Sequence, residues 1–463
     1  MGDDVNGAAV AQTFKAHDGI TGTDVAGNAG TQVDNTNITY DVAAPEFGSV
    51  TPADNAQVKA STRIAGWTNS ENLSAGSVVY TGTSGSDSGN AHNSVFDTAE
   101  KASGAHTLDV TGLVDANTYK LDVKGTDLAG NTTTLTRTGI IYDITNPAFG
   151  SITPITNAKI KAATRVVNWT NSEVLGAGAV SYTGTSGSDS GVTHSGDLTG
   201  KLGAGAQNVD VDGLVNNNTY SLSVSGTDIA GNTATITKTG IVYDTTGPVF
   251  TPVGPDTGLT IGPNSKTVTW SNSEALSSGQ VSYTSTAGSD SGSSYAVSMA
   301  GKLAQGNQSV NISGMVNASV YTLSVSGTDV AGNVGTTVTN TGIIYDDAAP
   351  SFGNVTPDTN ARIGAGSRIV AWTNSEALSA GTVTYTRTGG TADTDSPHAA
   401  SMAGKTGVGA QSLDVASNLV EGTTYKLDIQ GTDEAGNVGN LASKTGIVYD
   451  LTAPGFGSLT PAT

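Results

Sequence analysis

Gly125-Thr126-Asp127-Leu128-Ala129-Gly130-Asn131 is the stretch that decides the fold, because it recurs along the whole chain of 463 residues. The same heptad, varied only at its fourth position, occupies 22–28, 226–232, 327–333 and 431–437. Its aspartates are 103, 101, 101 and 104 residues apart, and they are Asp24, Asp127, Asp228, Asp329 and Asp433. A fixed period near 100 residues predicts a tandem array of one small module.

A Tyr-Asp pair and then a proline follow each heptad and mark the end of a repeat. The aspartates of these pairs are Asp41, Asp143, Asp244, Asp346 and Asp450, each four residues before a proline. Proline lacks an N–H and fixes φ, so it ends the preceding strand and stiffens the linker. The pattern predicts a partial repeat with terminal strands and linker at 1–45, four complete repeats at 46–146, 147–247, 248–349 and 350–453, and the start of another at 454–463. We expect the chain to be a section of a longer array.

Short alternating segments predict β-strands in every repeat. Val167 and Trp169 share one face of such a segment, and the same place holds Trp67, Trp270 and Trp372. Residues 220–225 alternate strictly between apolar and polar side chains, as a half-buried strand does. No segment has helical periodicity. The sequence therefore predicts an all-β fold, a tandem array of antiparallel sandwiches with six or seven strands each.

Composition narrows the classes of partner. The chain has 20 Lys and Arg against 40 Asp and Glu, a net charge of −20. This charge disfavours binding to nucleic acid and to anionic lipid. No run of eighteen apolar residues occurs, so membrane insertion is not expected. The chain has no cysteine, so its stability must come from packing or from metal ions.

A family resemblance rests on several of these motifs together. Leu113 stands six residues before Tyr119, a spacing that resembles the corner between strands E and F of fibronectin type III and Ig-like domains. With the tryptophan, the heptad and the Tyr-Asp-x-x-x-Pro linker, residues 41–453 resemble the bacterial Ig-like repeats of giant calcium-dependent surface adhesins. The resemblance implies an extracellular, calcium-rigidified stalk at the bacterial cell surface. Adjacent repeats would be its partners, and domains outside this section would bind any host or surface ligand.

Carboxylates are predicted to converge at each joint between repeats. In an Ig-like sandwich the B–C and F–G loops lie at the pole where the chain enters. Asp127 belongs to the F–G loop, Glu71 to the B–C loop and Asp41 to the entering linker. The other three predicted sets are Asp143, Glu173 and Asp228; Asp244, Glu274 and Asp329; and Asp346, Glu376 and Asp433, with Asp347 beside the last.

Two interpretations of these carboxylates stay open. Gathered carboxylates repel one another, and Ca²⁺, which takes six to eight oxygen ligands, is a common remedy. Alternatively, Asp127 and Asn131 bond only the backbone of their own turn, and Glu71 faces solvent or pairs with a lysine. The resemblance favours calcium.

A second acidic position lies in the glycine-rich stretch at 85–89. It holds Asp87, Asp189 and Asp290, and repeat four departs from the pattern with Asp393 and Asp395. We expect a solvated, flexible loop there rather than a second ion site. The five histidines are expected to lie on the surface, without carboxylate partners at repeated positions, and His194 near Asp197 is taken as one of them. No catalytic motif appears, so the chain is not expected to be an enzyme.

Residues with repeated positions are therefore structural or joint-forming, which is typical of a spacer. The predicted function is a stalk section of a secreted bacterial adhesin that projects a distal binding module. Three alternatives stay open. They are a self-assembling surface layer or filament, a ligand-binding module whose loops grip glycan or host protein, and an accessory region of an extracellular hydrolase. The second alternative needs aromatic clusters in loops, where Tyr295 is nearly alone.

Overall fold

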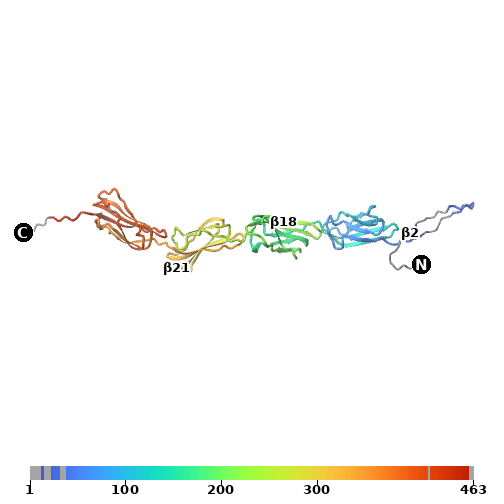
Figure 1. The fold of residues 1–463 in the computed structure, drawn as a ribbon, viewed down its shortest axis with the longest axis horizontal. Coiled ribbons are helices and arrows are strands. Elements are labelled where there is room, and N and C mark those ends of the chain that lie inside the picture. Colours follow the sequence, from blue (N-terminus) through green and yellow to red (C-terminus); the bar gives the residue numbers. More distant parts are fainter. Residues whose placement is uncertain (1–11, 15–21, 32–37, 416–417, 458–463) are drawn as a thin grey trace, which may run out of the picture. The chain divides into compact units, whose positions relative to one another are not determined.

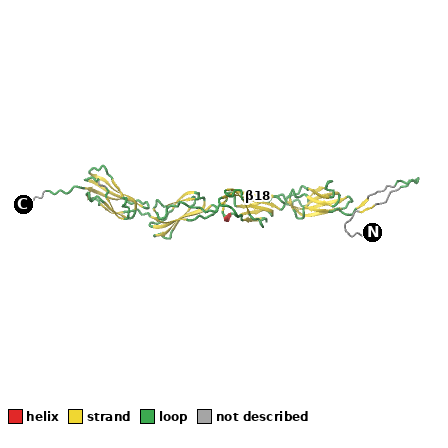
Figure 2. Cartoon of the chain, viewed as in Figure 1, coloured by secondary structure: helices red, strands yellow, loops and turns green. Residues whose placement is uncertain are grey.

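The computed structural model describes residues 12–14, 22–31, 38–415 and 418–457. Strands and loops make up nearly all of this part, and its helical structure is a single 3₁₀ turn at Ala162–Thr164 (Figure 2). None of its helical segments is long and apolar enough to cross a membrane. The chain forms two compact units, residues 1–243 and 244–463. We number the four predicted complete repeats 1 to 4, and their limits stay a prediction.

Repeat 1, coloured blue to cyan in Figure 1, is a sandwich of two sheets that share one core. One sheet has the order β3 (Phe47–Thr51), β5 (Ala65–Asn69), β8 (Gly104–Leu108). The other has the order β4 (Gln57–Val58), β10 (Thr132–Tyr142), β9 (Asn117–Asp127), β6 (Leu73–Ser84), β7 (Ala91–Val95). Neighbouring strands are antiparallel except β4 and β10, which are parallel.

Repeat 2 has the same topology within the first unit, and it ends with β18 (green in Figure 1). Its strands are β11 (Phe149–Thr153), β12 (Lys159–Ile160), β13 (Val167–Asn171), β14 (Leu175–Ser186), β15 (Thr193–Ser195), β16 (Gly205–Val209), β17 (Asn218–Asp228) and β18 (Thr233–Tyr243). Ahead of repeat 1, β1 (Gln12–Phe14) pairs antiparallel with β2 (Ile38–Tyr40). The rest of the predicted partial repeat lies largely outside the described residues.

The second unit contains repeats 3 and 4. Repeat 3 has β19 (Thr260–Ile261), β20 (Thr267–Asn272), β21 (Leu276–Ala287), β22 (Ser294–Ser298), β23 (Gly306–Asn311), β24 (Ser319–Asp329) and β25 (Val338–Tyr345). Isolated bridges from Phe250 and Gly254 stand where the other repeats have a first strand. Repeat 4 has β26 (Phe352–Thr356), β27 (Arg362–Ile363), β28 (Val370–Asn374), β29 (Leu378–Gly390), β30 (His398–Ser401), β31 (Gly409–Leu413), β32 (Thr423–Asp433) and β33 (Ala442–Tyr449).

The predicted all-β sandwich fold is confirmed, but the strand count differs. Repeats 1, 2 and 4 have eight strand segments rather than six or seven. The extra segment arises at the start of the repeat, where Pro52 follows Thr51 and lacks the N–H that a continuing strand needs. The chain then crosses to the other sheet and adds β4 alongside β10.

A tryptophan fills each core, as the sequence predicts. Trp67, Trp169, Trp270 and Trp372 are 1–3% exposed. In repeat 1 the indole N–H donates to Asn69 Oδ1 at 2.8 Å, and the Asn69 amide donates to the carbonyls of Glu100 and Ala102. The indole therefore buries its apolar surface and satisfies its donor as well.

The tyrosine corner is also present in all four repeats. The Tyr119 hydroxyl accepts the Val114 N–H at 2.8 Å, and the same bond joins Val215 to Tyr220, Val316 to Tyr321, and Val420 to Tyr425. Each tyrosine ring is fully buried. The bond fixes the loop between β8 and β9 against the core.

Replacing Trp169 with Ala should unfold repeat 2 and leave repeats 1, 3 and 4 folded. Such a truncation costs about 3–5 kcal/mol, a large part of the stability of a small domain. Hydrogen exchange read by mass spectrometry should show protection lost only in residues 149–243. Val174→Ala, at a half-exposed position, is the matched control and should change little. Simultaneous loss of protection in all four repeats would contradict independent folding.

Candidate metal centres

The structure brings together the three carboxylates predicted at each joint. In the first set Asp41 follows β2, Glu71 lies between β5 and β6, and Asp127 ends β9. One carboxylate oxygen from each of the three lies within 4.8 Å of the other two. The same spacing holds for Asp143, Glu173 and Asp228; for Asp244, Glu274 and Asp329; and for Asp346, Glu376 and Asp433.

Hydrogen bonds within the heptad loop shape each cluster. Asp127 Oδ1 accepts the Asn131 N–H and Oδ2 accepts the Asn131 side-chain amide, both at 2.8 Å. The same amide donates to the linker carbonyl of Asp41 at 3.0 Å. Gly130 has φ of +97°, a conformation that glycine adopts without strain. The turn bonds of the metal-free interpretation are therefore present. They leave the carboxylates lone pairs for a cation, because each carboxylate oxygen can accept more than one contact.

Electrostatics at the clusters favour a cation. Burial, followed by the negative charges of Asp41 and Asp127, raises the pKa of Glu71 above its ordinary value. The pKa values of Glu173 and Glu376 are raised in the same way. Among the ion pairs between described residues, none joins these three glutamates to a lysine or arginine. The lysine pairing considered from the sequence is not observed for them.

The linker aspartate of the second cluster carries the same signature. Burial raises the pKa of Asp143, a hydrogen bond from Thr145 opposes the rise, and the charges of Asp228 and Asp115 add to it. The donors at each cluster are carboxylate oxygens, which hard divalent cations prefer over nitrogen or sulfur ligands. The residues present therefore fit a hard divalent metal ion.

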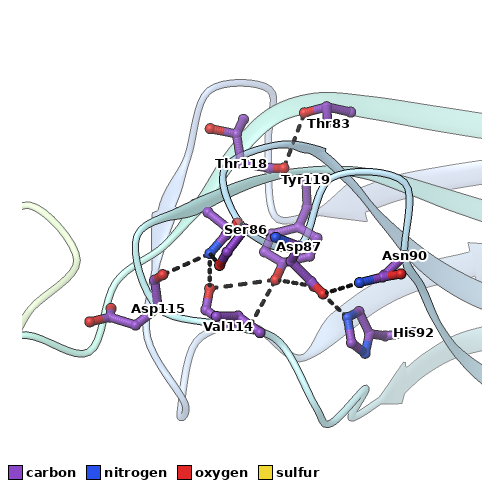
Figure 3. A network of polar contacts seen from close by, with 10 residues as sticks. Thr83, Ser86, Asp87, Asn90, His92, Val114, Asp115, Thr118 and Tyr119 are labelled. Carbon is purple, nitrogen blue, oxygen red and sulfur yellow. Dashed lines mark hydrogen bonds and ion pairs between the residues drawn. The ribbon is translucent and has the colours of Figure 1, made fainter.

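At the opposite pole of repeat 1, a buried polar network replaces the flexible loop that the sequence predicts (Figure 3). Asp87 is only 5% exposed. Its Oδ2 accepts the Tyr119 hydroxyl at 2.7 Å and contacts His92 Nε2 at 2.6 Å, while Oδ1 accepts the Asn90 amide. Its backbone N–H donates to Asn117 Oδ1 at 2.8 Å. The prediction of a solvated loop is wrong, because partners from β7 and β9 compensate the buried charge.

The prediction that histidines lack carboxylate partners at repeated positions is also wrong. The network recurs as Asp189, His194 and Tyr220 in repeat 2 and as Asp393, His398 and Tyr425 in repeat 4. Repeat 3 has Tyr295 in place of the histidine, bonded to Asp290. His194 therefore pairs with Asp189 and not with Asp197. The five-residue spacing from aspartate to histidine, repeated three times, was the sequence signal for this pairing.

Known proteins resemble the chain at the level of solved structures. No protein-family model and no curated protein matches it significantly. It is similar to a Ca²⁺-stabilised adhesin that helps an Antarctic bacterium reach out and bind ice (21% identity over 88% of this chain and 99% of that one, TM-score 0.26). It is also similar to a tetra-tandem repeat in the extending region of a large adhesion protein (21% identity, 87% and 99%, TM-score 0.28). A third is a 1.5-MDa bacterial ice-binding adhesin (22% identity, 66% and 98%, TM-score 0.27).

These structures belong to the adhesin repeats that the sequence motifs resemble. Identities and TM-scores this low leave the function of the chain to be argued from its own residues.

Glu173→Gln should stabilise repeat 2 at pH 7 in the absence of divalent metal. The raised pKa of Glu173 means that its charged form is disfavoured in the folded state, so the charge costs stability at neutral pH. The cost disappears as the pH falls below the ordinary glutamate pKa of about 4.3. Urea unfolding in EGTA from pH 4 to pH 7 should show the gap closing toward pH 4, when it is followed through Trp169 fluorescence in a chain whose other three tryptophans are replaced by phenylalanine. A gap that widens in acid would contradict the assigned cost of the Glu173 charge.

Asp87→Asn should show the opposite pH dependence in repeat 1. Hydrogen bonds from Tyr119, and then from Asn90 and His92, lower the pKa of Asp87 to about 2. Its contribution is therefore present above the ordinary aspartate pKa of about 3.9 and is lost as the pH falls toward 2. Hydrogen exchange of residues 85–92 should be faster in the variant at pH 6, with the difference narrowing in acid. The unchanged networks of repeats 2 and 4 are the internal controls.

Proposed function

We propose that this chain is a structural extender, a stalk section of a secreted bacterial adhesin, rigidified at its inter-repeat joints by calcium. The observation that carries the proposal is the recurrence of one carboxylate cluster at four joints. In each cluster the linker aspartate comes from one side of the joint and the other two carboxylates from the repeat that follows. An ion held by all three would tie a linker to the next repeat.

The physical case rests on charge. Three carboxylates within 4.8 Å repel one another, and this repulsion adds to burial in raising the pKa values of Glu71, Glu173 and Glu376. When bound, Ca²⁺ supplies two positive charges and accepts six to eight oxygen ligands. The chain's own residues do the rest: Asn131 and its counterparts hold the motif aspartate and the linker carbonyl in place.

In this function the chain performs no catalysis. Its partners are the adjacent repeats of the same chain, and it is exposed at the bacterial cell surface. A domain outside this section binds the host or surface ligand. The net charge of −20 keeps such an array soluble and disfavours contact with nucleic acid or anionic membranes.

Native mass spectrometry should count four calcium ions on the chain, one for each cluster. Asp143→Ala and Asp228→Ala should each remove one ion, and the double variant should also remove only one, because both residues serve the same joint. Calcium should raise the unfolding temperature at about 10⁻⁴ to 10⁻³ M, the range of extracellular calcium modules, and EGTA should reverse the effect.

The matched control is Asp122→Ala, since Asp122 lies on a strand of repeat 1 and pairs with Lys120 rather than with a cluster. It should keep all four ions. If the double variant lost two ions, a shared inter-repeat site would be refuted. If the unaltered chain bound none at millimolar calcium, the calcium-dependent stalk would be refuted as a whole.

A further inference from the structure

The loop between β8 and β9 of repeat 1 grips the linker that leaves the repeat. Asp115 Oδ1 accepts the Ile144 N–H at 2.8 Å, and Oδ2 accepts the Thr145 hydroxyl at 2.6 Å. Ile144 and Thr145 directly follow Asp143, the linker carboxylate of the second cluster. A side chain 28 residues earlier in the sequence therefore fixes the segment that carries a candidate metal ligand.

Asp143 itself makes three hydrogen bonds that hold it in place. Its N–H donates to the Val58 carbonyl at 2.9 Å, and its own carbonyl accepts the Asn232 amide at 3.0 Å. Its Oδ1 accepts the Thr145 N–H at 3.0 Å. Because Asp115 holds the Thr145 hydroxyl, it fixes the residue that in turn orients the Asp143 carboxylate.

The loop that carries Asp115 is supported from behind by the buried network. Figure 3 shows Asp115 at the edge of that network, where its carbonyl accepts the Asn117 amide at 2.8 Å. Asn117 Oδ1 in turn accepts the Asp87 N–H. A series of hydrogen-bonded residues thus leads from the buried Asp87 through Asn117 and Asp115 to the linker.

Equivalent positions in the second unit also bond the linker that follows, through a neutral side chain in repeat 3 and an acidic one in repeat 4. Asn317 Oδ1 accepts the Asp347 N–H at 3.1 Å, next to the linker carboxylate Asp346. Glu421 accepts the Thr452 hydroxyl, just after Asp450. In repeat 2 the position is Asn216. The position therefore keeps an oxygen acceptor in each contact while its charge varies between repeats.

We propose that Asp115 and Asn317 are positioning residues for the joint cation: both order the linker that carries a metal-binding carboxylate, and the presence or absence of a charge at this position tunes the affinity of the joint. This inference rests on the proposed calcium function and adds to it a position outside the four clusters. Asp115 contributes in two ways: it orders the linker before the ion binds, and it adds negative charge beside the site. Asn317 contributes the ordering alone.

Substitution separates the two contributions. Asp115→Ala removes both, and loss of an outer partner of a metal ligand costs about ten- to a hundredfold in affinity. Asp115→Asn keeps an acceptor for the Ile144 N–H, and its amide N–H can donate to the Thr145 hydroxyl oxygen in place of the bond that the second carboxylate oxygen accepts. The main loss is then the charge, so the expected weakening is smaller, about threefold, on the scale of one screened surface charge. Asn317→Asp adds a charge and should tighten binding at the Asp346 joint by a similar factor.

Hydrogen exchange resolves the joints individually. The calcium concentration that half-protects the loop around Glu173 reports affinity at the Asp143 joint, and the loop around Glu376 reports the Asp346 joint. In EGTA, exchange at the Ile144 amide should be faster in Asp115→Ala than in the unaltered chain and unchanged in Asp115→Asn. Unchanged protection at the Val114 amide controls for the fold of the loop.

The outcomes distinguish this inference from the proposed function. If Asp115→Ala left calcium half-protection at Glu173 unchanged while four ions still bound, the positioning role would be overturned and the stalk proposal would stand. If the unaltered chain bound no calcium, both would fall. A loss of affinity in Asp115→Ala, with a smaller loss in Asp115→Asn and a gain in Asn317→Asp, supports orientation and charge as separate contributions.

Discussion

The hydrogen-bonded aspartate and asparagine of the heptad, which are Asp127 and Asn131 in repeat 1, form the contact on which each joint depends. Two bonds to the Asp127 carboxylate and one from the Asp127 N–H to the Asn131 carbonyl close the heptad loop, and the Asn131 side-chain amide also donates to the carbonyl of the entering linker. The same side chains therefore build a turn and hold a neighbour. Closing the loop brings a carboxylate to within 4.8 Å of two others, and this concentrated charge is the reason a cation fits there.

The two ends of a repeat place their carboxylates in different electrostatic surroundings. At the entry end the carboxylates face one another, and burial together with their mutual repulsion raises the pKa of Glu71, Glu173 and Glu376. At the exit end a single buried carboxylate such as Asp87 is hydrogen-bonded to the side chains of Tyr119, Asn90 and His92, and its pKa is lowered to about 2. Asp115 connects these ends across a joint, since it is bonded to the exit network on one side and to the next linker on the other.

The sequence was sufficient for features that recur unchanged at the repeat period. The tryptophans, the tyrosine corner and the carboxylate sets all have identical residues at equivalent positions, and sandwich topology places the loops at one pole. It was insufficient where burial depends on contacts between distant segments. Asp87 sits among serines and glycines and reads as surface, yet Tyr119, 32 residues later, shields it. The linker grip was missed because Asp115, Asn216, Asn317 and Glu421 differ in identity, so repetition alone does not mark them.

The contrast between the two ends has a consequence for how such an array responds to acid. Protons compete with a cation for carboxylates, and those with raised pKa values, such as Glu173, are the first to be protonated as the pH falls. Asp87, with its lowered pKa, stays ionised well below that range. Mild acid would therefore neutralise the carboxylates at the joints, while the hydrogen-bonded networks inside the repeats persist. Repeats that stay folded across such a change can recover their joints when the charge returns, because the ordering of the linker by side chains such as Asp115 does not depend on the ion.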